Sequence, residues 1–499
     1  MIIHIIIKIL IKIIYRIFFN DEEILYNLIK LKELLKNRFI MTSNFSERFT
    51  SLIMNLMSKH SVPGLSVSVV KDNEILFERG FGYRNLDTLA PMTKNTLVGI
   101  GSISKSFTAI AVLQLQEKGL LNIEDPIIQY FPWFPQNLEK PVLLKHLLSH
   151  STGLPAIDGT ILEMLHHVKR HINFTPVVNR SDLEWYIKNA ENERLFDPVE
   201  QFFYNNDMYT LIGYLIEDLT NKKFVEYMRE HILKPLGMDR TTYSSEEVNN
   251  DSLNDVSTGY AIKDKKTLVF THPYSEFLNA AGGILSSAHE MTNYIKFILQ
   301  KGKFDGNILL REDTMDLLWQ PLIRSPITSG KDMYYCLGWN KGQFFGKSLV
   351  QHGGGLFSST ARLSILPEDN LGVFAIENDA KGVCAMVVDG ILAILTENDP
   401  ENLPTFRYSK IISEVEGTYK TYRGVYSLKV ELKDRLLWAH LEIDDGEFDL
   451  PITIKDAENL IFTVPAGLPE IQNEIRFLRD KATKKVVHAI YDRYLYHRS

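Results

Sequence analysis

The chain has 499 residues, which is long for one compact domain, so we expect two folded domains and an extra segment. A hydrophobic fraction of 45% and a charged fraction of 23% exclude wholesale disorder and a collagen-like architecture. The net charge of −7 argues against a basic surface for binding nucleic acid. The chain has only two cysteines, Cys336 and Cys384, which excludes a disulfide scaffold and a paired-cysteine zinc site. Such sparse cysteine usage predicts a cytoplasmic protein.

Residues 1–40 form a leader with a composition of its own. The first twenty residues contain ten isoleucines and no acid, and a basic or histidine side chain recurs every four residues from His4 to Arg16. On a helix this spacing forms one polar stripe. Three basic residues near the centre of a membrane span cost roughly 7–10 kcal/mol, whereas the apolar side chains return roughly 4–8 kcal/mol. The sequence therefore favours a helix that contacts the membrane interface through residues 1–20 over one that spans the membrane.

The leader leaves two interpretations open. An acid-poor, basic and amphipathic start also resembles an organelle transit peptide, which would be removed, and no small-residue site for secretory cleavage follows it. Alternatively, residues 1–40 are not native and Met41 is the true start, because the composition after Met41 is close to that of the rest of the chain. A native leader would indicate a membrane-associated or organellar protein.

The hydrophobic periodicity beyond the leader predicts strands at both ends of a long helical middle, from about residue 102 to residue 320. This arrangement favours an α+β fold in which helices and a helical subdomain flank an antiparallel sheet. Regular βαβ alternation is missing, which argues against a doubly wound sheet. The predicted elements are a helix at 45–59, a hairpin of strands 65–70 and 74–79, helices at 106–118, 207–219 and 289–300, and strands at 348–352, 361–366 and 371–377.

The pattern changes after the proline-rich breaker at residues 399–404. Residues 412–499 hold short alternating runs, separated by turn signals at roughly 8–12 residues, which is typical of a small antiparallel barrel or sandwich. We therefore expect one domain at residues 41–400 and a β-barrel domain at residues 405–499.

A serine and a lysine three residues apart, Ser102 and Lys105, stand where a run becomes apolar and helical. Residues at i and i+3 share a helix face, and a buried lysine with a lowered pKa can take the serine proton. A serine at a helix N-terminus also has free N–H groups close to developing negative charge. About two such pairs are expected by chance, and the other one, Ser68 and Lys71, lies on a predicted strand with its side chains on opposite faces. From this motif alone, a helix cap at Ser102 with Lys105 in solvent is the simpler interpretation.

Two further motifs follow in order: Tyr204-Asn205-Asn206 opens a predicted helix, and Gln351-His352-Gly353-Gly354-Gly355 ends a predicted strand. The series resembles the serine β-lactamase and penicillin-binding-protein superfamily, in its class C-related branch of serine hydrolases, which carries S-x-x-K, Y-x-N and then K-T-G or H-x-G. The resemblance covers about residues 45–395. Other matching stretches are Val62-Pro63-Gly64-Leu65, Gly80-Phe81-Gly82-Tyr83, Leu147-Leu148-Ser149-His150-Ser151-Thr152-Gly153-Leu154, Pro235-Leu236-Gly237-Met238 and Ala281-Gly282-Gly283-Ile284-Leu285-Ser286-Ser287.

The resemblance implies an acyl-enzyme mechanism that needs no metal or cofactor. Ser102 would be the acylated nucleophile and Lys105 its proton acceptor. Lys105 would share this role with Tyr204, which would also protonate the leaving group and activate the hydrolytic water. Asn206 would hold the amide or ester side chain of the substrate. The backbone N–H groups of Ser102 and Gly355 would form the oxyanion hole.

The same resemblance places His352, Gly354 and Gly355 on the substrate side of the site. His352 stands where β-lactam-cleaving relatives keep a lysine, which favours an esterase or a D-aminopeptidase-like peptidase acting on small esters, amides or peptides. An unperturbed histidine is mostly neutral above pH 7, so we expect neutral substrates to be favoured at pH 8 and their advantage over anionic ones to narrow towards pH 6. Burial of His352 or a nearby Lys105 would lower its pKa and move this change to lower pH. An orienting hydrogen bond without an ionic role is the alternative for His352.

Other features leave alternatives. Val199 replaces the glycine of the usual Pro-Gly ahead of the tyrosine motif, so a different turn is expected there. His146 and His150 are predicted to share a helix face, but the metalloprotease glutamate is missing between them. The segment 416–426 loosely resembles a lipocalin-like barrel that could bind a ligand or shield the active-site mouth, with a structural role as the default. The rival to a hydrolase is a non-catalytic scaffold of the same fold, assembled at a membrane through residues 1–40.

Overall fold

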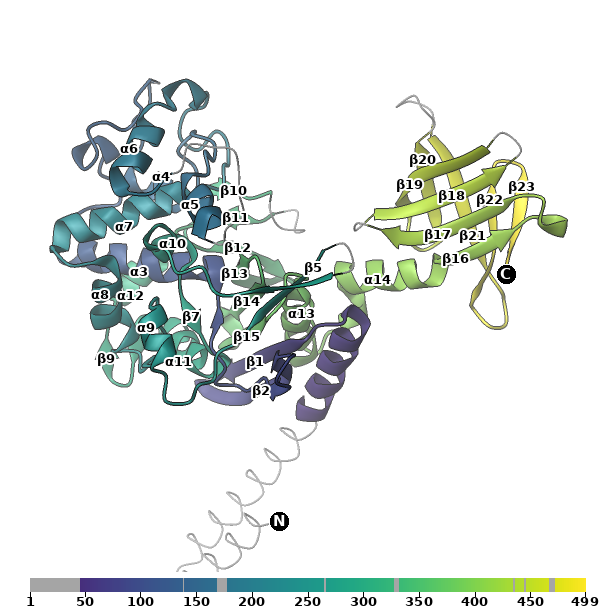
Figure 1. Cartoon of the computed structure of the whole chain (residues 1–499), viewed down its shortest axis with the longest axis horizontal. Coiled ribbons are helices and arrows are strands. Elements are labelled where there is room, and N and C mark those ends of the chain that lie inside the picture. Colours follow the sequence, from purple (N-terminus) through teal and green to yellow (C-terminus); the bar gives the residue numbers. More distant parts are fainter. Residues whose placement is uncertain are drawn as a thin grey trace, which may run out of the picture. The chain divides into compact units, whose positions relative to one another are not determined.

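The computed structural model describes residues 45–137, 139–167, 177–263, 266–326, 332–433, 436–443, 446–465 and 472–499. The predictions for the leader and for a start at Met41 lie outside the described residues. The chain divides into two compact units between Ile391 and Leu392 (Figure 1). Residues 41–400 and 405–499 as domain boundaries stay predictions.

A nine-stranded antiparallel sheet organises the first unit, in the order β10-β11-β12-β13-β14-β15-β1-β2-β3. Strands from both ends of the unit meet in its middle, because β1 pairs with β15 on one side and with β2 on the other. The strands are β1 (Gly64–Lys71), β2 (Glu74–Asn85), β3 (Ala90–Pro91), β10 (Ile323–Arg324), β11 (Tyr334–Tyr335), β12 (Asn340–Phe344), β13 (Lys347–Leu356), β14 (Ser359–Leu366) and β15 (Leu371–Glu377).

The predicted hairpin is β1 and β2, and its turn explains its register. Asp72 and Asn73 both have positive φ angles, 52° and 64°, as a two-residue hairpin turn of the primed type requires. Short polar side chains tolerate this backbone better than other residues. The turn sets Lys71 opposite Glu74. A bulge follows, because Val70 pairs with Ile75 and Val69 with Phe77, which leaves one extra residue in β2.

Helices cover both faces of the sheet. On one face α11 (Ala288–Leu299) packs on β1 and β15, and α3 (Ser104–Glu117) lies in the same core. On the other face Phe49, in a helix at residues 45–60, contacts Phe77 of β2 with ring centroids 5.5 Å apart. The further helices are α4 (Leu144–Leu148), α5 (Gly159–His167), α6 (Arg180–Lys188), α7 (Asn206–Thr220), α8 (Phe224–Met228), α9 (Ser245–Asn249), α10 (Glu276–Gly282), α12 (Glu312–Leu317) and α13 (Val383–Leu395).

Helix α3 is buried on all sides, since every residue from Ser104 to Leu115 is buried. A helix of this kind belongs to the centre of a core rather than to its surface. Its polar side chains therefore need internal partners: the Thr108 hydroxyl donates to the Ala280 carbonyl, and the Ser106 hydroxyl accepts from Tyr294. This helix brings Lys105 into the interior.

The second unit is a closed eight-stranded antiparallel barrel, which confirms the predicted barrel. It closes where β16 pairs with β23. Buried apolar side chains such as Phe462 and Phe477 fill its interior, and α14 (Pro404–Val415) adds Ile411, Ile412 and Val415 to this core. The strands are β16 (Gly417–Lys420), β17 (Ser427–Lys433), β18 (Leu436–Ile443), β19 (Gly446–Asp456), β20 (Ile461–Pro465), β21 (Gln472–Arg479), β22 (Val486–Tyr491) and β23 (Tyr494–Arg498).

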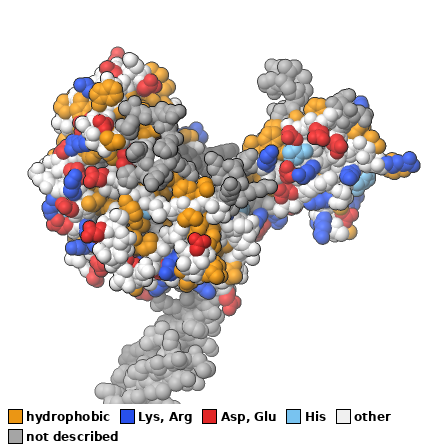
Figure 2. Space-filling model, viewed as in Figure 1, with side chains coloured by type: hydrophobic (Ala, Val, Ile, Leu, Met, Phe, Trp, Pro, Cys, Tyr) orange, Lys and Arg blue, Asp and Glu red, His pale blue; other side chains and the backbone are white. Residues whose placement is uncertain are grey.

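Charges of both signs are interspersed over the visible surface of each unit (Figure 2). Within the described ranges, no helix has the length and apolar character that crossing a bilayer would need.

The remaining strands form three small two-stranded sheets, namely β4 (Val98–Gly99) with β7 (Leu285–Ser286), β5 (Gly259–Lys263) with β6 (Lys266–Phe270), and β8 (Lys303–Phe304) with β9 (Asn307–Ile308).

Candidate active site

Ser102 lies in a short 3-10 turn, Gly101–Ile103, that leads directly into α3. The prediction of a helix from residue 106 is two residues late, because the helix begins at Ser104. The N-cap position of α3 is Ile103, which makes no side-chain cap, so Ser102 is not the cap of this helix. Its hydroxyl is instead within hydrogen-bond distance of Lys105.

Lys105 is fully buried and has three partners. Its Nζ lies 3.1 Å from Ser102 Oγ, 2.8 Å from Asn206 Oδ1 and 2.6 Å from the carbonyl oxygen of Ala281. Burial lowers the pKa of Lys105 well below its ordinary value. A neutral amine has two N–H groups and one lone pair, so it can donate to Asn206 and Ala281 while the Ser102 hydroxyl donates to it. The geometry thus suits Lys105 to take the proton of Ser102.

Tyr204 and Asn206 reach the same point from the start of α7. The Asn205 side chain caps this helix, since its Oδ1 accepts from the N–H of Asp207 at 3.0 Å. Tyr204 is hydrogen-bonded to Ser102, and burial raises the pKa of its phenol far above the usual value. The ring centroid of Tyr204 lies 4.9 Å from Lys105 Nζ. Among the two groups able to accept a proton from Ser102, the structure therefore favours the lysine amine over a phenolate.

Two glycines let the glycine motif of β13 pack against the serine turn. Gly101 has a φ of 54°, and a Cβ on it would lie 2.7 Å from the backbone nitrogen of Gly355. A Cβ on Gly354 would lie 1.8 Å from the carbonyl oxygen of Ile100, and 3.4 Å from the nitrogen of Ser102. Any side chain at these positions would push the two segments apart. The structure therefore brings Gly354 and Gly355 beside Ser102.

His352 lies inside β13, which continues through the glycines to Leu356 instead of ending at them. The ring is buried, and its Nδ1 lies 2.6 Å from the carbonyl oxygen of Gly353. A carbonyl only accepts, so Nδ1 carries the proton and Nε2 accepts from the hydroxyl of Tyr335 at 2.8 Å. Both ring nitrogens are thus engaged within the protein, as expected for an orienting hydrogen-bonder.

The expectation that His352 gains a proton near pH 6 is wrong. Burial, with Lys105 nearby, lowers its pKa to about 3. The imidazole is neutral throughout the physiological range, so it offers no charge whose change could narrow the gap between neutral and anionic substrates.

His150 was predicted to share a helix face with His146, and this is wrong because α4 ends at Leu148. His150 has a φ of 58° and turns away from the helix. Its ring lies against that of Tyr204, with centroids 4.1 Å apart, and its pKa is lowered well below the ordinary value by burial. The sequence did not indicate this residue as part of the site. Ser-Thr-Gly directly after it, a turn signal, could have indicated that the helix stops before His150.

Val199 has a φ of 72°, in the left-handed region that favours glycine. A β-branched residue there is strained, and its N–H donates to the carbonyl of Ser151 at 2.9 Å. The segment that leads to Tyr204 therefore keeps a glycine-like turn without the glycine.

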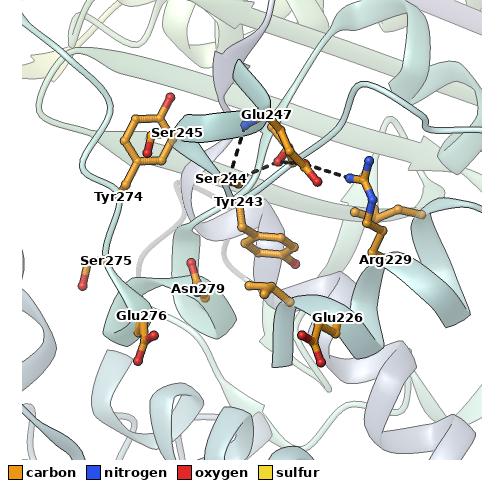
Figure 3. Close-up of a pocket in the computed structure, with 13 residues that line it drawn as sticks. Glu226, Arg229, Tyr243, Ser244, Ser245, Glu247, Tyr274, Ser275, Glu276 and Asn279 are labelled. Carbon is orange, nitrogen blue, oxygen red and sulfur yellow. Dashed lines mark hydrogen bonds and ion pairs between the residues drawn. The ribbon is translucent and has the colours of Figure 1, made fainter. Parts of the chain in front are cut away.

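A separate cavity of about 350 Å³, whose lining does not include Ser102, lies between α8, the start of α9 and α10 (Figure 3). Glu226, Glu247 and Glu276 line it, and Arg229 donates to Glu247 at 2.8 Å. Its α10 residues precede Ala281, whose carbonyl faces Lys105. In the part of the chain that the structure describes, no three His, Cys, Asp or Glu side chains are placed to hold a metal ion.

Comparison with known proteins matches both units. A model of the Beta-lactamase family matches residues 49–395, and a model of the Pab87 octamerisation domain matches residues 400–497. The penicillin-binding-protein homologue from Pyrococcus abyssi, whose structure is described as octameric, superimposes with a TM-score of 0.82 and 28% identity. That match covers 90% of this chain and 99% of the other. The structure of SurE, at 21% identity and a TM-score of 0.56, shares the fold.

Two curated bacterial proteins also match. Penicillin-binding protein 4* of Bacillus subtilis (strain 168) is 24% identical over 455 residues, covering 91% of this chain and 83% of that protein. Protein flp of Staphylococcus aureus (strain MW2) is 25% identical over 342 residues. The match covers 68% of this chain, and this chain spans 64% of the length of flp.

Proposed function

Because the chain belongs to the Beta-lactamase family through residues 49–395, we propose that it is a serine hydrolase that forms an acyl-enzyme at Ser102. Small esters, amides or peptides are the proposed substrates. The observation that carries the proposal is the amine of Lys105, fully buried, depressed in pKa and 3.1 Å from Ser102 Oγ. Ordinary structural lysines keep their charge in solvent, whereas perturbed groups gather at functional sites.

In the proposed acylation step, the Ser102 hydroxyl gives its proton to the neutral amine of Lys105, and Oγ attacks the substrate carbonyl carbon. The resulting oxyanion accepts hydrogen bonds from the N–H groups of Ser102 and Gly355. When the tetrahedral intermediate collapses, Tyr204 gives its phenolic proton to the leaving oxygen or nitrogen, and the Lys105 ammonium restores that proton. In deacylation, water takes the part of Ser102 as the attacking group and follows the same proton transfers. Ser102 then leaves the acyl group and returns to its starting state.

Asn206 links the catalytic amine to the substrate in this proposal. Its Oδ1 accepts from Lys105 at 2.8 Å, which fixes the orientation of the amide. The NH2 group of Asn206 is then free to donate to the substrate's carbonyl. The buried neutral imidazole of His352 lends no charge, so uncharged acyl groups fit the site better than carboxylate-bearing ones.

The proposal is tested with a fluorophosphonate probe, followed by intact-mass analysis and peptide mapping. We expect one adduct at Ser102, absent in Ser102→Ala and strongly slowed in Lys105→Ala. Folded wild-type protein that takes up no probe would contradict the proposal and support the non-catalytic scaffold.

The proposed neutrality of the substrate has its own test. With matched neutral and anionic esters, the ratio of their kcat/KM values should stay within about twofold between pH 6 and pH 8, because a pKa of about 3 leaves His352 uncharged at both. A ratio that moves towards the anionic ester at pH 6 would show that a group in the site gains charge.

We also propose that the second unit assembles copies of the chain. The match of residues 400–497 to an octamerisation domain and the octameric relative support this. Light scattering on the full chain should give a mass several times the monomer's 57.4 kDa. A monomer at micromolar concentration would contradict this assignment.

A further inference from the structure

One residue, His150, holds the backbone on both sides of Tyr204. The carbonyl oxygen of His150 accepts from the N–H of Phe203 at 3.0 Å. Its ring Nδ1 accepts from the N–H of Asn205 at 3.1 Å. The same ring lies against the phenol ring of Tyr204, with centroids 4.1 Å apart and the planes inclined by 38°. Three contacts from a single residue thus enclose Tyr204.

The segment that carries Tyr204 is irregular and is otherwise held by side chains: Asn205 Nδ2 donates to the Pro155 carbonyl at 3.1 Å, and the Tyr204 ring packs on Tyr335. Residues 202–205 are in neither helix nor strand, and α7 begins only at Asn206. The N–H groups of Phe203 and Asn205 therefore have no partner within a regular element, and both are satisfied by His150. Without these bonds, the position of the Tyr204 hydroxyl relative to Ser102 would depend on an irregular loop.

The imidazole must be neutral to do this. Because Nδ1 accepts from Asn205, the ring proton sits on Nε2, which is buried and has no hydrogen-bond partner in the described structure. The ring is enclosed by Phe202, Tyr209 and Tyr335, with centroids 4.7 to 5.9 Å away. Protonation would place a second proton on Nδ1, facing the N–H of Asn205, and would break that bond. Burial disfavours this charge.

The backbone of His150 is arranged for the same purpose. Its φ of 58° is left-handed, a conformation that is strained for a non-glycine residue. This turn directs both the carbonyl and the side chain towards residues 203–205. Strain of this kind persists where the surrounding structure over-determines it, often at sites where geometry matters.

We propose that His150 is a positioning residue for the hydrolysis, acting through Tyr204. The inference rests on the proposed function, in which Tyr204 protonates the leaving group. Loss of the Nδ1 acceptor should let the phenol drift from the leaving group, while Ser102 and Lys105, held by α3, keep their geometry. A displacement of about 1 Å in a catalytic group can cost about 100-fold in rate.

Two matched variants separate the acceptor from the ring. In His150→Asn, Oδ1 takes the place of Nδ1 and asparagine tolerates the left-handed backbone. In His150→Phe, the ring bulk is kept but the acceptor is lost. We expect kcat for an amide substrate to fall about 30- to 100-fold in His150→Phe, with KM changed less than threefold, and to stay within about fivefold of wild type in His150→Asn.

The dependence on the leaving group distinguishes positioning from general damage. Fluoride leaves the fluorophosphonate probe without needing a proton, and p-nitrophenolate leaves an ester nearly as easily, whereas an amine must be protonated. His150→Phe should therefore label with the probe within about threefold of the wild-type rate, keep most of the p-nitrophenolate burst that reports ester acylation, and lose most amide turnover. Tyr204→Phe should show the same order of losses, and adding His150→Phe to it should cost no more than about twofold further.

Equal losses with probe, ester and amide would overturn the inference, as would losses that add in the double variant. If His150→Phe does not fold, His150→Ala is read in the same way, with probe stoichiometry as the check on folding. Wild-type protein that fails to react with the probe would instead overturn the proposed function, so the two failures are distinguishable.

Discussion

The interiors of the two units differ in the kind of side chain that they bury. The first unit buries charged and polar groups next to its apolar core, among them Lys105, His150 and His352. In the described part of the second unit, no histidine, amide or charged side chain is buried, and the barrel is filled by aliphatic and aromatic residues. Burying polar groups costs stability unless each is paired. The first unit therefore carries the stability cost of buried polar groups, and the interior of the barrel does not.

Replacing Lys105 by methionine tests the first half of this comparison. The change removes the amine and keeps much of the side-chain volume, so we expect hydrolysis to fall about 10³- to 10⁴-fold. The melting temperature should fall by only a few degrees, because removing a buried amine offsets part of the cost of leaving the acceptors of Asn206 and Ala281 without their donor. Steady-state kinetics and calorimetry on the same preparation provide both readings.

Lys118→Met is the matched control, because Lys118 is the exposed C-cap residue at the other end of α3. Its activity should remain within twofold of wild type. A large loss of stability in Lys105→Met, with activity retained, would mean that Lys105 stabilises the fold and is not needed for hydrolysis.

The barrel should respond in the opposite way. Phe462 is fully buried and meets Phe477 edge to face, with ring centroids 5.3 Å apart. Phe462→Ala should destabilise the barrel by about 3–5 kcal/mol, measured as lost hydrogen-exchange protection in residues 417–498. Labelling of Ser102 by the probe should not change, and the exposed Phe448→Ala should cost less than about 0.5 kcal/mol.

Acid should weaken the first unit selectively. Burial lowers the pKa of His146 and His272 to about 4 and of His352 to about 3, and lowers that of His150 as well. Below pH 6.5 these histidines bind protons in the unfolded chain but stay neutral in the folded unit. The free energy of unfolding therefore falls as the pH falls. Burial raises the pKa of Glu377 to about 7, so the folded unit binds a proton there that the unfolded chain does not. This effect on stability cancels that of one of the four histidines. A net difference of about three protons weakens the fold by roughly 4 kcal/mol between pH 6 and pH 5.

Tryptophan fluorescence can follow this acid effect. Four of the five tryptophans precede residue 392 and report on the first unit, namely Trp133, Trp185, Trp319 and Trp339. Urea midpoints measured by fluorescence should drop steeply between pH 6.5 and pH 5, while barrel exchange protection stays nearly constant. Midpoints that move together, or do not move, would mean that the buried histidines are not held neutral.

Relief of backbone strain next to the site should give the smallest effect. Val199→Gly removes a penalty of roughly 1–2 kcal/mol for the left-handed φ and adds an entropy cost of about 0.5–1 kcal/mol. We expect a net stabilisation of about 0.5–1 kcal/mol. The control Val269→Gly, at an exposed position of strand β6, should destabilise instead. Urea denaturation of both variants decides the sign, and destabilisation in both would show that Val199 is not strained.

The sequence predicted the features that depend on local pattern and failed on those set by burial. The fold class and the closed barrel are confirmed, because alternation and helical periodicity carry them. The structure brings together Ser102, Lys105, Tyr204 and Asn206, as their motifs suggested, and their roles stay predictions. The two-residue strands were missed, since nothing so short shows a period.

The two histidine errors have one origin. Whether His352 is charged depends on how deeply β13 is covered, and the place of His150 depends on a helix that ends after Leu148. The residues next to these histidines in the sequence predict neither the depth of burial of His352 nor the turn that places His150. An isolated histidine in a sequence therefore shows only that a group able to titrate is present, and packing decides whether it titrates.

The place of β1 inside the sheet, between β15 and β2, has a consequence for the order of synthesis. Lys71 pairs with Leu371, a residue that the ribosome adds 300 positions later. At about 5–20 residues per second, the hairpin of β1 and β2 waits roughly 15–60 s before its partner strand exists. During that interval the edge of β1, from Leu65 to Val70, offers unpaired backbone to any other nascent chain. The newborn protein is therefore exposed to misassociation until β15 emerges, and shielding by a chaperone would be most valuable before that point.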